Sequence, residues 1–120
     1  MMNTGMNIKQ REIFLIPFPY TDLSGIKRRP ALVLSNSKYH NHNDDVICCA
    51  ITSNKSQLKR GIKIENSNLD KGFFTEESVV MPCKLFTVHI NNLIKNIGTI
   101  KLDKIKEIVD ETKLNIEIEE

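Results

Sequence analysis

Residues 12–19 read EIFLIPFP, and residues 29–35 read RPALVLS. Both runs are short, rich in β-branched and aromatic residues and bordered by proline, so each predicts a β-strand rather than a helix. The second run is apolar on both faces, which predicts a buried strand in the centre of a sheet. Pro30 fits that strand because proline is tolerated at the first residue of a strand. Residues 21–28 lie between the two runs and predict an exposed loop in which Gly25 can adopt a positive φ.

Short apolar segments continue toward the C-terminus. Further strands are expected at residues 46–51, 62–65, 78–81, 85–90 and 94–100. The polar segments between them predict loops: residues 36–45, with at most one helical turn, residues 56–61, which are basic, and residues 66–75.

The hydrophobic period changes near the end of the chain. Leu102, Ile105, Ile108 and Val109 recur at three- and four-residue steps, which predicts an amphipathic helix with Asp103 as its N-cap. Residues 113–118 fit either the last turns of that helix or an alternating strand. Short strands followed by one helix predict a β-rich α+β fold, such as a small β-barrel with a C-terminal helix. We expect a flexible segment at residues 1–9 and a single domain at residues 10–120.

Composition places few further limits on function. The chain has 120 residues, of which 40% are hydrophobic and 27% charged, as in ordinary globular domains. It has no apolar run long enough to span a membrane and no signal-peptide pattern, so we expect a cytoplasmic protein without a membrane partner. Its three cysteines form no C-x-x-C motif, and Cys48 and Cys49 are expected to be small buried hydrophobes. No cofactor or metal is expected.

Charge is distributed unevenly along the chain. Residues 101–120 contain four lysines and seven acidic residues, whereas residues 1–100 contain 13 basic and eight acidic residues. A mildly basic body with an acidic tail is compatible with a polyanionic partner such as RNA, although many solvated surfaces carry a similar charge.

Two clusters of polar residues stand out at the ends of predicted buried strands. Lys27, Arg28 and Arg29 precede the strand at 31–35. Pro30 is expected to fix the backbone of Arg29, so that the guanidinium of Arg29 can bind a phosphate through two parallel hydrogen bonds. Thr52, Ser53 and Asn54 follow the strand at 46–51, and Lys59 and Arg60 extend the positive charge. The alternatives are a solvated loop tip and hydroxyls that only satisfy the backbone at a strand end.

The three histidines are the candidate proton carriers. His40 and His42 lie in a polar loop, and His89 alternates with apolar residues, so all three are expected to be solvated rather than catalytic.

Several of these segments match one family in order and spacing. Glu12-Ile13 and Arg29-Pro30-Ala31-Leu32 are similar to a strand G-D/E-I/V and a following R-P-A/V-L/I/V, with Arg11 in place of the usual glycine. Ile51-Thr52-Ser53 is similar to a strand that ends in T-S/T. Residues 77–80 and 84–88 (ESVV and KLFTV) and residues 97–102 (IGTIKL) are similar to the later D/E-S-V, Q-I/L-R-T-I/V and I-G-x-L segments. Over residues 10–118 the chain therefore resembles the MazF/PemK toxins.

The resemblance implies a fold, an activity and a set of site residues. Members are homodimeric barrels of SH3-like architecture that cleave single-stranded RNA without metal, through the ribose 2′-OH, and that are neutralised by a cognate antitoxin protein. Their catalytic pair corresponds to Arg29, which would stabilise charge on the phosphoryl oxygens, and Thr52, which would hold the phosphate in line. The residues expected to bind RNA are Lys27, Arg28, Ser53, Asn54, Lys59, Arg60 and Lys84.

The alternative within the same family is a non-catalytic binding module, such as a gyrase-poisoning toxin or a protein that only pairs with an antitoxin. Arg29 and Thr52 together favour cleavage, because a gyrase-binding protein has no need of that pair.

The chain also departs from the family pattern. Asp22 stands in place of a glutamate in the first loop, and Cys83 stands where an acidic residue is common. Phe86 and His89 replace the arginine and the acid of the R-T-I/V-D segment. These changes predict an altered base preference, and weaker activity is the further consequence left open.

Overall fold

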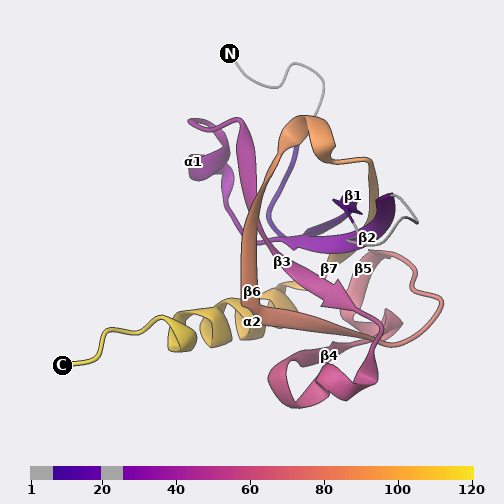
Figure 1. Ribbon diagram of the computed structural model, residues 1–120, viewed down its shortest axis with the longest axis vertical. Coiled ribbons are helices and arrows are strands. Elements are labelled where there is room, and N and C mark those ends of the chain that lie inside the picture. Colours follow the sequence, from indigo (N-terminus) through magenta and orange to yellow (C-terminus); the bar gives the residue numbers. More distant parts are fainter. Residues whose placement is uncertain (1–6, 20–25) are drawn as a thin grey trace.

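The computed structural model describes residues 7–19 and 26–120, so the expected loop with Asp22 and Gly25 lies outside the described residues. Within these residues, seven strands form one antiparallel sheet in the order β4-β6-β3-β2-β1-β7-β5. The sheet curls on itself, and the C-terminal helix packs against β6 (Figure 1). The predicted β-rich fold with a C-terminal helix is confirmed.

The elements follow one another along the chain with short connections. In order they are β1 (Glu12–Pro19), β2 (Ile26–Val33), α1 (Ser37–His40), β3 (Asp45–Thr52), η1 (Lys55–Arg60), β4 (Ile62–Ile64), η2 (Asn66–Asn68), β5 (Leu69–Gly72), β6 (Ser78–His89), η3 (Ile90–Asn92), β7 (Lys95–Ile100) and α2 (Leu102–Asn115). Among the described residues, no helix has the length and hydropathy needed to cross a bilayer.

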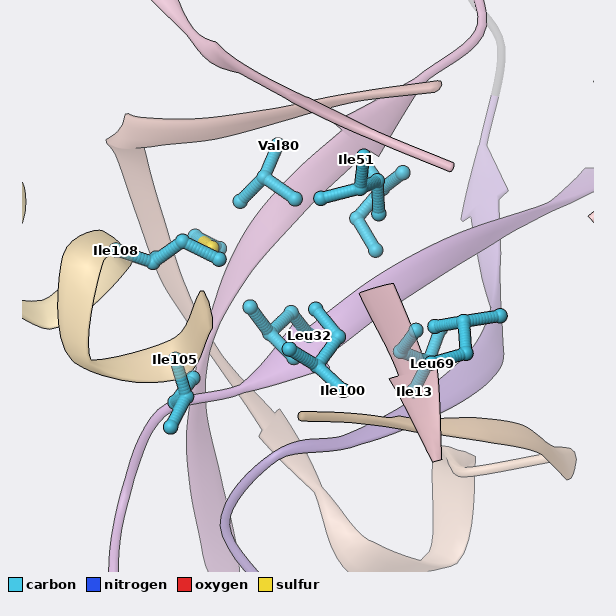
Figure 2. Packing of buried hydrophobic residues seen from close by; sticks show 10 residues of the cluster. Ile13, Leu32, Ile51, Leu69, Val80, Ile100, Ile105 and Ile108 are labelled. Atoms are coloured by element: carbon cyan, nitrogen blue, oxygen red, sulfur yellow. The ribbon is translucent and has the colours of Figure 1, made fainter. Parts of the chain in front are cut away.

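Both faces of the central strands are buried, which explains why their sequences are apolar without alternation. Neighbouring residues point to opposite faces, so Ile13 and Leu32 enter one cluster while Phe14 and Val33 enter another. The first cluster is completed by α2 and is shown in Figure 2; its buried members are Ile13, Leu32, Cys49, Ile51, Ile64, Leu69, Val80, Ile100, Ile105 and Ile108.

Cys48 and Cys49 also point to opposite faces of the sheet. Both are fully buried, Cys49 in the first cluster and Cys48 in the second. Burial raises the pKa of the Cys48 thiol to about 12 and also raises that of Cys49, so both are protonated hydrophobes, as the sequence predicts.

The structure corrects the predicted start of the second strand. β2 begins at Ile26, so Lys27 and Arg28 belong to the strand and Pro30 lies inside it. Pro30 is accommodated because β2 pairs with β1 from Ile26 onward, whereas its pairing with β3 begins only at Ala31. A residue without an N–H therefore occupies a position where the ladder to β3 has not yet started.

The two strands predicted at 78–81 and 85–90 are one strand, β6, of 12 residues. Pro82, Cys83 and Lys84, which lie between the two predicted strands, form a bulge, since the register against β3 shifts between Cys49 and Ala50. A bulge absorbs a proline and bends the strand without ending it.

Three smaller predictions were also wrong. The basic segment predicted as a loop at 56–61 is largely the 3₁₀ helix η1, and the polar segment 66–75 contains the edge strand β5. The N-cap of α2 is Lys101, while Asp103 lies in its first turn, where a carboxylate still interacts favourably with the helix dipole. The helix ends at Asn115, which decides between the two alternatives for residues 113–118.

Candidate functional site

An open depression of about 390 Å³ lies where β1, β2, β3, η1 and β6 meet. Its walls combine apolar side chains with a small number of polar ones: Phe18, Arg29, Pro30, Ala50, Ile51, Thr52, Asn54, Gln57, Met81 and Lys84. Two of these ten residues are cationic and none is acidic, so the depression suits a negatively charged group. We call it the Arg29–Thr52 pocket.

The two residues expected to be catalytic are both in this pocket and both half-buried. Arg29 lies on β2 opposite Ile16 of β1, and Thr52 is the last residue of β3, opposite Val79 of β6. Strand pairing fixes both backbones, so the side chains are presented from rigid elements. Residues 23 positions apart in the sequence are thereby brought to one site by the neighbouring strands β2 and β3.

A local hydrogen bond orients the Thr52 hydroxyl. The backbone N–H of Asn54 donates to Oγ1 of Thr52 at 3.1 Å, so the hydroxyl already acts as an acceptor. Its own hydrogen is then directed to a different acceptor, such as a phosphate oxygen in the pocket.

Asn54 serves as the N-cap of η1. Its Oδ1 accepts hydrogen bonds from the backbone N of Ser56 at 3.0 Å and from the Ser56 hydroxyl at 2.7 Å. Residues three apart lie on one side of a 3₁₀ helix, so Asn54 and Gln57 face the same pocket. The cap thus fixes the direction in which the sequence after β3 leaves the sheet.

Lys84 and Phe18 complete the polar and aromatic sides of the pocket. Lys84 is exposed in the bulge of β6 and lines the same pocket as Arg29. The Phe18 ring packs edge-on against Phe86, with ring centroids 5.8 Å apart. Phe86, which replaces the family's arginine, therefore has a packing role beside the pocket.

Not every residue predicted to bind RNA lies in the pocket. Lys27, Arg28 and Ser53 are exposed next to pocket residues on β2 and after β3. Lys59 and Arg60 border a different depression, of about 450 Å³, together with Cys83 and Glu111. Four of the nine predicted site residues line the pocket itself: Arg29, Thr52, Asn54 and Lys84.

The histidines lie elsewhere in the described structure. Nε2 of His40 is 2.7 Å from the Ser35 hydroxyl, and its Nδ1 is 3.0 Å from the Ile8 carbonyl oxygen, so this side chain joins the N-terminal segment to the sheet. His89 Nδ1 accepts from the Asn91 backbone N at 3.0 Å, and His42 is exposed. None of the three borders the Arg29–Thr52 pocket.

Within residues 7–19 and 26–120, no group of three or more His, Cys, Asp and Glu side chains is arranged to hold a metal ion.

Six pocket residues were not predicted as site residues, and two of them, Phe18 and Gln57, have aromatic or polar side chains. Phe18 lies near the end of β1, where an aromatic between two prolines was interpreted only as part of a strand. Gln57 lies in a segment that was interpreted as an irregular loop. The signal for Gln57 was its position three residues after Asn54, a good N-cap residue, but this has meaning only once the segment is known to be helical.

Comparisons with known proteins identify the fold and the family. The sequence model of the family described as PemK-like, MazF-like toxin of type II toxin–antitoxin system matches residues 9–116. No curated protein sequence matches the chain significantly.

Solved structures share the fold at low identity. The MazE–MazF complex (Form-III) of Deinococcus radiodurans is 18% identical, with a TM-score of 0.72, covering 93% of this chain and 98% of that one. The Mycobacterium tuberculosis toxin MazF-mt6 is 18% identical, with a TM-score of 0.69, covering 92% and 100%. An endoribonuclease in complex with its cognate antitoxin, from Mycobacterial species, is 18% identical, with a TM-score of 0.68, covering 96% and 99%. On the family match over nearly its whole length, the chain belongs to the PemK-like, MazF-like toxins of type II toxin–antitoxin systems.

Proposed function

We propose that this toxin is an endoribonuclease that cleaves single-stranded RNA at the Arg29–Thr52 pocket, without a metal ion. The observation that carries the proposal is the convergence of Arg29, Thr52 and Lys84 on one pocket whose described lining residues include no acidic side chain. Two cations and an oriented hydroxyl are suited to hold a phosphodiester and to stabilise the charge that develops on it.

The reaction begins with attack of a ribose 2′-oxygen on the adjacent phosphorus. A P–O2′ bond forms, the P–O5′ bond breaks, and the 2′-hydroxyl proton is lost while the leaving 5′-oxygen gains one. The products are a 2′,3′-cyclic phosphate and a 5′-hydroxyl. Arg29 donates hydrogen bonds to the phosphoryl oxygens as charge builds on them, and the Thr52 hydroxyl donates to the same phosphate and keeps it in line. A guanidinium has no acceptor atom, so Arg29 acts by electrostatic stabilisation.

The partners proposed for the chain follow from the same family membership. Two of the similar structures are a MazE–MazF complex and an endoribonuclease bound to its cognate antitoxin. We propose a cytoplasmic homodimer that is neutralised by its own antitoxin, whose acidic segment competes with RNA for the basic surface. An isologous dimer would present two copies of the pocket.

A second candidate function is non-catalytic binding of a protein target on the same fold. The exposed residues Lys59 and Arg60 favour it to a limited extent, because they form a basic surface apart from the pocket. This candidate does not need Arg29 and Thr52 to share a site.

The test is cleavage of one long single-stranded RNA in excess EDTA, with both new ends identified chemically. We expect cyclic phosphate and 5′-hydroxyl ends. A double variant, Arg29→Ala with Thr52→Ala, purified in parallel, controls for contaminating nucleases. Products with 5′-phosphate ends, or no cleavage by the native chain, would refute the proposed reaction. A gyrase supercoiling assay would then test the second candidate function.

A further inference from the structure

Gln57 has an unusual environment for a pocket residue. Its Oε1 atom is buried and has no hydrogen-bond partner among the described residues, although the side chain borders the Arg29–Thr52 pocket. Buried polar atoms in folded proteins are nearly always paired, so an acceptor left without a donor needs an explanation.

Hydrogen bonding fixes the backbone of Gln57 but leaves its amide oxygen unpaired. The Gln57 backbone N donates to the Asn54 carbonyl oxygen at 3.1 Å, within the helix that Asn54 caps. Three rotatable side-chain bonds separate this fixed backbone from the amide. Rotation about these bonds would carry the amide oxygen from its buried position to a ligand in the pocket without any movement of η1.

The other polar groups of the pocket have different tasks. In the proposed reaction Arg29, Thr52 and Lys84 hold the phosphate, and contacts to phosphate carry no sequence information. Asn54, the other amide side chain in the pocket, uses its Oδ1 to accept two hydrogen bonds from Ser56. Of the two amide oxygens among the described pocket residues, that of Asn54 accepts two hydrogen bonds, whereas that of Gln57 accepts none and keeps its full capacity to accept one from a ligand.

We infer that Gln57 is a specificity-determining residue, whose amide oxygen accepts a hydrogen bond from an N–H group of the base next to the scissile phosphate. Phe18, in the wall of the same pocket, supplies an aromatic surface on which that base stacks. Bases of single-stranded RNA are recognised in this way, through their exposed edges and by aromatic side chains. The inference rests on the proposed function, because it concerns the substrate of that reaction.

The experiment compares single-turnover rates on short RNAs around one mapped cleavage site. The RNAs differ only in the base on either side of the cleaved bond, with all four bases tested at each position. Gln57→Met keeps the length of the side chain and removes the acceptor, whereas Gln57→Glu keeps an acceptor oxygen. Leu58→Met is the control on the same helix, since Leu58 is 46% exposed and does not border the pocket.

We expect Gln57→Met to reduce the preference for the favoured base at one position by about ten-fold, the effect of losing a contact to a base edge. Gln57→Glu should retain the ranking of bases, with lower rates throughout, because a carboxylate repels the RNA backbone. Leu58→Met should match the native protein, and circular dichroism should show that all three variants are folded.

Three results would overturn the inference. Gln57→Met could keep the native ratios between bases, or it could lower the rates on all RNAs by the same factor, which would assign Gln57 to the backbone. In both cases cleavage by the native protein leaves the proposed function intact. Absence of cleavage by the native protein would instead refute the proposed function and, with it, the inference.

Discussion

Arg11 stands where the family usually has glycine, and its backbone explains both the glycine and the exception. Its φ is 84°, in the left-handed region that costs an ordinary residue about 1–2 kcal/mol. The side chain compensates for this cost, since Nη1 donates to the Ile100 carbonyl oxygen at 2.9 Å and lies 3.2 Å from Asp70 Oδ2. Charge-assisted hydrogen bonds of this kind typically contribute about 1.5–3 kcal/mol, while a half-exposed ion pair adds less than about 1 kcal/mol.

Two substitutions of Arg11 separate these effects. Arg11→Ala keeps the unfavourable φ and loses both contacts, so the free energy of unfolding should fall by about 2–3 kcal/mol. Arg11→Gly loses the same contacts but removes the backbone cost of about 1–2 kcal/mol, partly offset by the larger entropy of glycine in the unfolded chain. The glycine variant should therefore be more stable than the alanine variant by about 1 kcal/mol.

Urea denaturation followed by circular dichroism measures this difference, and equal m-values for the two variants would show that only stability has changed. If Arg11→Ala were as stable as Arg11→Gly, the backbone argument would be wrong. If Arg11→Ala were as stable as the native protein, the side-chain contacts would contribute nothing.

Three further predictions concern charge, backbone and thiols. Lys84→Ala should weaken binding of a short RNA and reduce the slope of log K against log salt by about 0.7, measured by fluorescence anisotropy. Gly72→Ala should lower the free energy of unfolding by about 3 kcal/mol in urea, because Gly72 has a φ of 92° and a Cβ there would meet a backbone oxygen of β7 at 2.1 Å. A thiol reagent at pH 8 should modify Cys83 alone in the native chain and all three cysteines in denaturant, since burial keeps Cys48 and Cys49 protonated.

The strands were predictable where burial alone determines them. β1, β2 and β3 contain residues that pack on both faces of the sheet, so their apolar runs are visible in the sequence. β5 has an exposed Asp70 and Lys71 and lies at the sheet edge, so its strand depends on pairing with β7 and leaves no hydrophobic signal. β6 was predicted as two strands because its middle residues, Pro82 to Lys84, form no apolar run, and the bulge that joins the two halves is defined by pairing with β3.

The pocket was predictable only in part, and the reason lies in η1. Arg29 and Thr52 were found from their positions at strand ends and from a family resemblance. Lys59 and Arg60 follow Thr52 closely in sequence, but they lie at the far end of η1 and border another depression. The same helix brings Gln57 into the pocket. If the segment is treated as an irregular loop, the sequence gives no basis for deciding which of its residues face the pocket.

The central claim, that Arg29 stabilises the transition state of RNA cleavage, is tested most directly by one rate. We expect Arg29→Ala to lower the single-turnover cleavage rate of a labelled RNA by about 100- to 1000-fold at saturating enzyme, because it removes a donor aimed at developing charge. Circular dichroism should show a native fold, since Arg29 is outside both buried clusters. Lys106→Ala, which removes an exposed charge on α2, should cleave at the native rate. Cleavage by folded Arg29→Ala at the rate of the native protein would contradict the account.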